Sequence, residues 1–272
     1  MSVHDEKKKI TVPDILQMKA TRTPIAALTA YDALMARLLD ESGIDLILVG
    51  DSAAMVMAGH ETTLPITMEA MLYHVQSVRR GIHRALLVAD MPFLSYQVSI
   101  EEGIRNAGRF IKEGGAEAVK IEGGEAVIPL VERLVQIGIP VMGHLGLVPQ
   151  SIHQFGSYKL QGKDPRAAKR LKREAKRLQE AGIFALVLEK IPAPLAKEIT
   201  EMLDVPTIGI GAGPHCDGQI LVTHDMLGMF DRFKPKFVRR YAELASAMRQ
   251  AFKTYIQDVR QHQFPSADES YE

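Results

Sequence analysis

The stretch Ala118-Val119-Lys120-Ile121-Glu122-Gly123-Gly124 carries two opposite charges inside an otherwise apolar strand pattern. Side chains alternate between the faces of a strand, so Lys120 and Glu122 share one face while Val119 and Ile121 share the other. Burying an ion is costly even after the structure relaxes. The charged face therefore predicts a polar site, with an internal salt bridge of no chemical role as the alternative. The two glycines allow the backbone to turn tightly and to approach a ligand.

Short apolar runs and helical patterns alternate on both sides of this stretch. Buried parallel strands are expected at 25–31, 45–52, 85–92, 118–124, 140–147, 184–192, 206–213 and 218–225. Amphipathic helices are expected at 11–19, 32–43, 67–80, 99–112, 125–137, 165–181 and 194–203. This alternation predicts an α/β fold, a single-domain (β/α)8 TIM barrel, and the alternative is a doubly wound open sheet.

The two ends of the chain differ from the barrel in composition. We expect a polar segment at 1–10 without the apolar core of a secretory signal, the barrel domain at 11–260 and a polar tail at 261–272. A last helix is expected at 235–259. Its apolar face needs a partner, either the barrel or a neighbouring subunit, and comprises Phe237, Tyr241, Leu244, Met248, Phe252 and Tyr255.

The charge balance limits the classes of partner. Thirty-three basic and thirty-three acidic residues cancel over 272 residues, which argues against nucleic acid or an anionic membrane as the main partner. The basic residues of 165–179 lie mostly opposite an apolar stripe, as in a solvated barrel helix. No apolar run approaches the ~20 residues that span a bilayer. The single cysteine, Cys216, suits a reducing cytoplasm, so we expect a cytoplasmic protein.

Polar or ionisable side chains recur at the carboxyl ends of five successive expected strands. They are Asp51 and Ser52, Asp90, Lys120 and Glu122, His144, and Glu189. A lone acid at such a position is usually a loop-facing residue. Barrel enzymes carry their chemistry at this end of the strands, so five ends in register predict an active site.

Three of these residues, Asp51, Asp90 and Glu122, come from neighbouring strands and can converge. Converging carboxylates repel one another unless a cation neutralises them. Oxygen ligands without cysteine or paired histidines favour Mg²⁺, which can act as a Lewis acid on a carbonyl. Lys120 beside such a site can pair with a substrate carboxylate or stabilise an oxyanion, and a Schiff-base lysine is the competing role.

Glu189 follows the apolar run 184–188. A carboxylate in apolar surroundings is a credible general base for a weakly acidic C–H bond, and the alternative is an exposed acid paired with Lys190. The stretch Gly209-Ile210-Gly211-Ala212-Gly213 is similar to a phosphate cradle, but tight packing explains it equally well. His215 and Cys216 have no base or metal partner that the sequence can assign.

Several motifs together resemble the ketopantoate hydroxymethyltransferase family, from about residue 11 to the end of the last helix. They are Val49-Gly50-Asp51-Ser52, Met91-Pro92-Phe93-Leu94-Ser95-Tyr96, Lys120-Ile121-Glu122-Gly123-Gly124, Gly143-His144-Leu145-Gly146-Leu147-Val148-Pro149-Gln150 and Cys216-Asp217-Gly218-Gln219. The resemblance implies a Mg²⁺-dependent enzyme of pantothenate and coenzyme A biosynthesis. It would transfer a hydroxymethyl group from 5,10-methylenetetrahydrofolate to 3-methyl-2-oxobutanoate through a Mg-stabilised enolate, forming 2-dehydropantoate. It also implies a homodecamer.

The same resemblance implies roles for individual residues. Asp51, Asp90 and Glu122 would serve the metal. The oxo acid would contact Asp51, Ser52, Asp90 and Lys120. Glu189 would accept the proton, while His144 matches an active-site histidine of open role.

Two other functions are compatible with the same residues. One is a Mg²⁺-dependent 2-oxo-acid C–C lyase of the phosphoenolpyruvate mutase and isocitrate lyase type, and the other is a non-catalytic barrel scaffold. Such lyases typically use a reactive cysteine in a mobile loop, whereas Cys216 lies late in the chain. Retention of charged residues at five strand ends argues against a scaffold.

Overall fold

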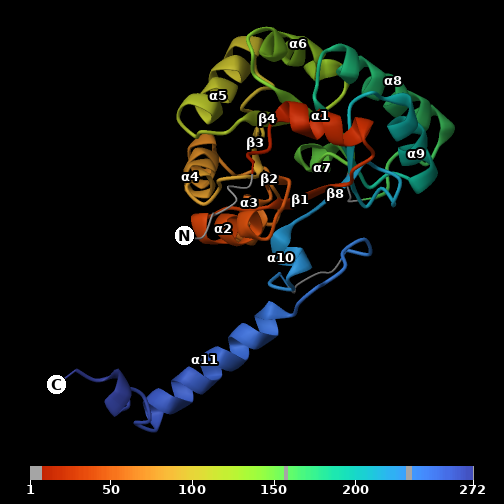
Figure 1. The fold of residues 1–272 in the computed structure, drawn as a ribbon. Helices are drawn as coiled ribbons and strands as arrows, with labels where there is room; N and C mark the ends of the chain where they lie inside the picture. The colour runs from red at the N-terminus through yellow and green to blue at the C-terminus, as the bar shows by residue number, and fades with distance from the viewer. Residues whose placement is uncertain (1–7, 156–158, 231–234, 272) are drawn as a thin grey trace. The chain divides into compact units, whose positions relative to one another are not determined.

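Parallel strands pair in sequence order into a closed barrel in the computed structural model, which describes residues 8–155, 159–230 and 235–271 (Figure 1). The strands are β1 (Ile25–Thr29), β2 (Leu46–Val49), β3 (Leu86–Asp90), β4 (Ala118–Glu122), β5 (Val141–Gly146), β6 (Ala185–Glu189), β7 (Thr207–Ile210) and β8 (Gly218–Leu221). Each lies within its expected range. Pairing of β1 with β8 closes the sheet, so the predicted TIM barrel is confirmed and the open-sheet alternative is wrong.

Helices follow most of the strands and surround the barrel, and α1 precedes β1. The longer ones are α1 (Val12–Ala20), α2 (Ala33–Glu41), α4 (Met68–Arg79), α5 (Ile100–Lys112), α6 (Ile128–Gln136), α8 (Pro165–Glu180) and α9 (Ala193–Met202). Side chains cap the first turns of α2, α4, α5 and α8, as Asp32 does for α2 and Asp164 for α8. The shorter turns α3 (Ala53–Val56), η1 (Glu125–Val127), η2 (Pro149–Ser151) and α7 (Ile152–Phe155) lie in loops at the carboxyl ends of strands. These elements have only three or four residues each, which is too short for a helical periodicity to be recognised in the sequence.

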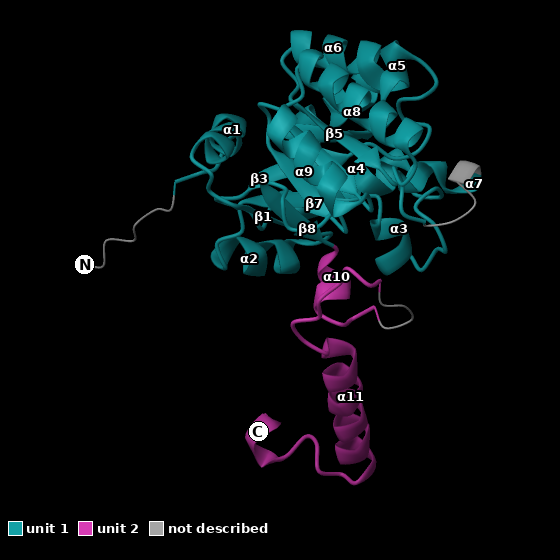
Figure 2. Ribbon diagram, turned by 90° about the vertical axis from the view of Figure 1, so that its right-hand side faces the viewer, with its two compact units in different colours: residues 1–221 teal, residues 222–272 magenta. Residues whose placement is uncertain are grey.

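The chain divides into two compact units, residues 1–221 and 222–272 (Figure 2). Of the expected N-terminal segment, residues 1–7 lie outside the described part, and the expected domain bounds stay a prediction. The second unit contains α10 (Thr223–Met226), α11 (Leu244–Arg260) and η3 (Ala267–Glu269). None of the helices in the described ranges is long and apolar enough to span a bilayer.

Two expected element boundaries are wrong, one at the end of the first unit and one in the second unit. The strand expected to reach residue 225 stops at Leu221, and the helix expected from residue 235 begins at Leu244. The backbone explains the late start, because Tyr241 N–H donates to Met226 O at 2.8 Å and Leu244 N–H to Leu227 O at 2.9 Å. These bonds hold the chain before α11 against the end of α10 instead of in a helical turn.

Alternate strand residues form apolar rows that lead to the polar site. One buried cluster joins Ala27, Leu46, Leu48, Leu86, Val88, Ala118, Met142, Ala185, Val187, Ile208 and Ile220. In β4 the row continues from Ala118 to Lys120 and Glu122, while Val119 and Ile121 belong to the cluster that includes the surrounding helices. The predicted shared face of Lys120 and Glu122 is therefore confirmed. The rows of β3, β5 and β6 continue in the same way to Asp90, His144 and Glu189.

The amino ends of the strands are held by acids that precede even-numbered strands. Asp45, Glu117 and Asp217 each accept a backbone N–H from the preceding strand, at 2.9, 3.1 and 2.8 Å. Each also pairs with a cation; for Asp217 this is Lys19 of α1, at 2.9 Å. Residues at this end of a TIM barrel serve stability, whereas the opposite end carries the chemistry.

Candidate active site

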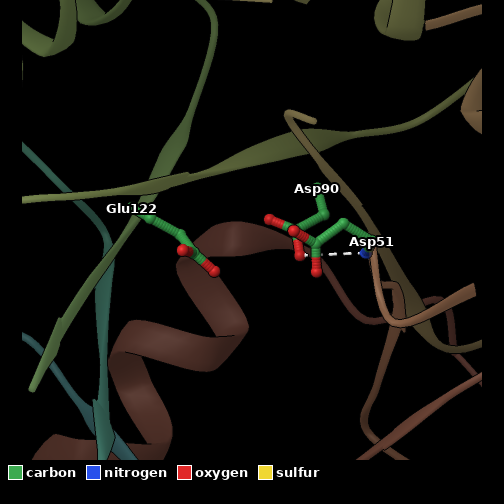
Figure 3. A group of neighbouring side chains, drawn as sticks. All are labelled: Asp51, Asp90 and Glu122. Carbon is green, nitrogen blue, oxygen red and sulfur yellow. Dashed lines mark hydrogen bonds between the residues drawn. The ribbon is translucent and has the colours of Figure 1, made fainter. Parts of the chain in front are cut away.

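Three carboxylates converge at the carboxyl ends of β2, β3 and β4. Asp51, Asp90 and Glu122 are buried, and one oxygen from each lies within 4.8 Å of the others (Figure 3). The backbone N–H of Asp51 donates to Asp90 Oδ2 at 3.2 Å. Successive strands of a closed barrel are neighbours, which is why residues far apart in sequence meet here. We call these three residues the acidic cluster.

Lys120 lies against the acidic cluster. Its Nζ is 2.6 Å from Asp90 Oδ1 and 3.4 Å from Glu122 Oε1. Strand register explains the first contact, because Asp90 of β3 pairs with Lys120 of β4. Burial lowers the pKa of Lys120, but the neighbouring carboxylates outweigh burial and raise it above its ordinary value. Lys120 is therefore a cation at neutral pH, and it is already engaged with the cluster.

Positive charge from the chain does not fully neutralise the acidic cluster. Burial raises the pKa of Asp51 well above its ordinary value, and the charges of Asp90 and Glu122 raise it further. Burial and the charge of Glu122 raise the pKa of Asp90, and together they outweigh Lys120, which lowers it. A buried all-oxygen donor set with surplus negative charge fits a hard divalent cation such as Mg²⁺.

His144 lies between Glu122 and Glu189. Its Nδ1 is 3.2 Å from Glu122 Oε1 and its Nε2 is 3.4 Å from Glu189 Oε2, though neither contact has hydrogen-bond alignment. Burial lowers the pKa of the ring, as does Lys120. The two carboxylates outweigh both and raise the pKa of His144 to about 9.

The cationic ring affects its two neighbours differently. Burial raises the pKa of Glu122, but Lys120 and His144 outweigh it and lower the pKa to about 2. The Glu189 side chain remains 15% exposed at the end of β6, whereas the acidic cluster is buried. Of the four carboxylates at this end of the barrel, Glu189 is thus the most open.

Comparison with known proteins agrees with this arrangement. A model of the family described as ketopantoate hydroxymethyltransferase matches residues 9–267. The chain belongs to the ketopantoate hydroxymethyltransferase family. The chain is 57% identical over 265 residues to 3-methyl-2-oxobutanoate hydroxymethyltransferase from Syntrophotalea carbinolica, covering 97% of this chain and 99% of that protein. It is 55% identical to the enzyme of the same name from Chlorobaculum tepidum, covering 96% of each.

Solved structures of other enzymes share the fold. A 2,3-dimethylmalate lyase of the PEP mutase/isocitrate lyase superfamily aligns with a TM-score of 0.64 at 16% identity, covering 97% of this chain and 89% of the lyase. A phosphonopyruvate hydrolase complexed with oxalate and Mg²⁺ aligns with a TM-score of 0.62 at 12% identity, covering 96% and 93%. At these identities the likeness shows the barrel fold alone, while the family match identifies an enzyme of the hydroxymethyltransferase family.

Ser52 lies beside the acidic cluster and is held by a residue that the sequence did not indicate. Its Oγ is 2.8 Å from Tyr31 Oη, and the Tyr31 carbonyl is 2.8 Å from His74 Nδ1. Tyr31 follows β1 and is buried. A buried tyrosine beyond a strand reads as core in sequence, so only the structure shows that its hydroxyl reaches the Ser52 side chain.

The glycines that follow β4 have separate structural causes. Gly123 has a φ of +126°, which side-chain-bearing residues rarely adopt, and its N–H donates to His144 O at 3.1 Å. A Cβ on Gly124 would lie 2.4 Å from Glu174 Cδ, so this position makes room for the Glu174 side chain. Close approach to a ligand stays a prediction for both.

Gly213 and Cys216, which lie between β7 and β8, are explained by packing. A Cβ on Gly213 would lie 2.4 Å from Ala193 Cβ, which agrees with the tight-packing alternative for 209–213. Burial raises the pKa of Cys216, whose thiol contacts the hydroxyls of Thr207 and Thr200. Cys216 precedes β8 and therefore lies at the amino end of the barrel, opposite the acidic cluster. This position gives no support to the cysteine-dependent lyase alternative.

Proposed function

We propose that this chain transfers a hydroxymethyl group from 5,10-methylenetetrahydrofolate to 3-methyl-2-oxobutanoate, with uptake of water, forming 2-dehydropantoate and tetrahydrofolate for pantothenate biosynthesis. One observation carries the proposal. In a chain of this family, the buried acidic cluster lies one histidine away from a more open carboxylate, Glu189. The arrangement offers a cation site and a separate proton acceptor, as removal of a proton beside a keto group requires.

Asp51, Asp90 and Glu122 would hold Mg²⁺. When bound, the ion would act as a Lewis acid on the carboxylate and keto oxygens of the oxo acid. Lys120 Nζ, at 2.6 Å from Asp90, lies where it can offset negative charge that develops on the substrate. Asp51, Ser52 and Asp90 would line the oxo-acid site together with Lys120.

Glu189 would take the C3 proton. Its Oε2 lies 3.4 Å from Nε2 of His144, whose pKa is raised to about 9 by the two carboxylates beside it. A ring that already carries its proton cannot act as the base itself, so we assign His144 the role of supporting Glu189. After proton removal, C3 of the enolate would form a bond to the one-carbon unit of the folate, which would leave tetrahydrofolate.

A turnover assay with both substrates tests this proposal. Chelation with EDTA should abolish product formation, and Mg²⁺ should restore it. Asp90→Asn should sharply raise the Mg²⁺ concentration needed, because it removes one charged ligand. Full activity in a rigorously metal-free sample would contradict the metal site. Cleavage of the oxo acid without folate would favour the lyase alternative.

We also infer that the protein is a cytoplasmic homodecamer. The assembly rests on the family resemblance and on apolar side chains that α11 leaves exposed in the single chain, including Met248, Phe252 and Tyr255. An amphipathic face of this kind is typical of a surface buried between subunits. The cytoplasmic location rests on the single cysteine of the sequence.

A further inference from the structure

Gln150 forms hydrogen bonds with two residues of the acidic cluster and with the loop that follows β3. It lies in η2 beyond β5 and is 5% exposed. Its Nε2 donates to Asp51 Oδ2 at 3.1 Å and to Met91 O at 2.8 Å. Its Oε1 accepts from Tyr96 Oη at 2.8 Å and from Gln97 Nε2 at 3.0 Å. All four hydrogen-bonding positions of the amide are therefore filled, by partners in the loops that follow β2 and β3.

The partners determine which way the amide points. Met91 O is a carbonyl and can only accept, so the amide nitrogen must face it. The amide oxygen faces donors instead: Gln97 Nε2 donates to Gln150 Oε1 at 3.0 Å. Tyr96 Oη lies 2.8 Å from the same oxygen and 3.1 Å from Glu122 O, the second acceptor within reach of its proton. The nitrogen of Gln150 is thus fixed toward Asp51.

The backbone of Gln150 holds a second member of the cluster. Its N–H donates to Glu122 Oε2 at 3.2 Å. One residue therefore fixes one oxygen of Asp51 through its side chain and one oxygen of Glu122 through its main chain. The side-chain contact is the part that a substitution can remove.

These bonds leave one cluster oxygen without a partner from the chain. Asp90 Oδ1 and Oδ2, Glu122 Oε1 and Oε2, and Asp51 Oδ2 all contact donors. Among the residues that the structure describes, only Asp51 Oδ1 of the cluster receives no hydrogen bond or ion pair. Because Gln150 Nε2 occupies Oδ2, the amide decides which Asp51 oxygen stays open.

We propose that Gln150 is the positioning residue of the cation site, and that it presents Asp51 Oδ1 to the divalent cation by holding Oδ2. This role rests on the proposed Mg²⁺ site and adds a determinant of its affinity. Tyr96 and Gln97 act on the cation site indirectly, because they fix the orientation of the Gln150 amide. Partners that orient a metal ligand are commonly worth about 10- to 100-fold in metal affinity or activity.

A merely structural role for the buried amide gives a different expectation. Gln179 offers the matched control, since its Oε1 accepts from Asp204 N at 2.6 Å and Val205 N at 3.3 Å, and its Nε2 donates to Asp204 Oδ2 at 3.0 Å. It lies near the carboxyl end of α8, away from the acidic cluster. Gln179→Ala removes a comparable set of bonds and should lower stability without affecting cation binding.

The test is a titration of the full-length protein with Mn²⁺, which serves as a paramagnetic probe for the Mg²⁺ site. The free ion is measured by electron paramagnetic resonance, and thermal unfolding is recorded for each variant. We expect Gln150→Ala to weaken Mn²⁺ binding about 10- to 100-fold. Gln179→Ala should bind as the wild type does. Equal affinity in Gln150→Ala and the wild type would overturn the positioning role while leaving the proposed metal site intact.

A second variant keeps the inference testable if Gln150→Ala does not fold. Tyr96→Phe removes only the hydroxyl, which contacts Gln150 Oε1 and the backbone of Glu122, and it should weaken Mn²⁺ binding by a smaller factor than Gln150→Ala. Unchanged affinity in Tyr96→Phe would contradict its orienting role. A wild-type protein that binds no Mn²⁺ would overturn both the inference and the proposed metal site.

Discussion

The ammonium group of Lys120 lies against the acidic cluster. Replacing Lys120 with methionine removes the charge while keeping a side chain of similar length. Its Nζ lies 2.6 Å from Asp90 and 3.4 Å from Glu122. Coulomb's law with an effective dielectric constant of about 20 gives about 6 and about 5 kcal/mol of attraction at these distances. Desolvation of the ammonium offsets much of this, and removing one partner of a buried pair commonly costs about 3–5 kcal/mol.

The loss in free energy of unfolding has an upper bound, because one carboxyl of the acidic cluster can take up a proton instead of remaining charged. For a carboxyl with the ordinary pKa of 3.8, protonation costs about 4 kcal/mol at pH 7 and about 2 kcal/mol at pH 5. We therefore expect Lys120→Met to lower the free energy of unfolding by about 3–4 kcal/mol at pH 7, and by about half as much at pH 5.

Urea unfolding in EDTA, followed by circular dichroism at one protein concentration, measures this loss at both pH values. Added Mg²⁺ should raise the midpoint more for Lys120→Met than for the wild type, because the cluster then lacks its own cation and binds the ion more tightly. Lys19→Met is the control, since it breaks a lysine–aspartate pair of 2.9 Å at the other end of the barrel and should leave the Mg²⁺ response unchanged. An unaltered midpoint for Lys120→Met in EDTA would refute the reasoning.

Two glycines, a half-buried acid and the last helix give further expected outcomes. A Cβ on Gly146 would lie 2.2 Å from Glu189 O, so Gly146→Ala should displace Glu189 and reduce turnover about 10²-fold. Gly138→Ala meets no atom within 4 Å at a similar φ of +88° and should keep full turnover; equal losses would contradict the clash. Burial raises the pKa of Asp225 from 3.8 to about 6, so the folded state binds the extra proton and stability falls as the pH rises through this window. Asp225→Asn should thus raise the unfolding free energy at pH 7.5 by at most about 3 kcal/mol, but not at pH 4, as thermal melts at both pH values would show. Light scattering should report a mass near ten chains, and a stable monomer at micromolar concentration would exclude the decamer.

Strand periodicity made the centre of the site predictable. Alternation placed Lys120 and Glu122 on one face, and the sequential strand order of a barrel placed Asp51, Asp90 and Glu122 next to one another. These inferences need only the two-residue period and the order of strands, which are properties of the local sequence.

Contacts made by loops could not be predicted from the sequence. The position of Gln150 against Asp51 depends on how η2 folds back over the barrel, and no spacing rule encodes that path. Tyr31 reaches Ser52 from the end of another strand, and a buried tyrosine gives the same pattern whether or not its hydroxyl has a partner. The late start of α11 depends on backbone bonds to Met226 and Leu227, which the apolar periodicity of its sequence does not reveal.

Proton removal at C3 of 3-methyl-2-oxobutanoate is the step that tests the account most directly. The substrate is incubated in D₂O with protein and Mg²⁺ but without folate, and deuterium at C3 is followed by NMR. We predict exchange with the wild type, and a rate about 10² to 10⁴ lower with Glu189→Gln, in which binding of the oxo acid is retained. Exchange at the wild-type rate in Glu189→Gln would show that Glu189 is not the base.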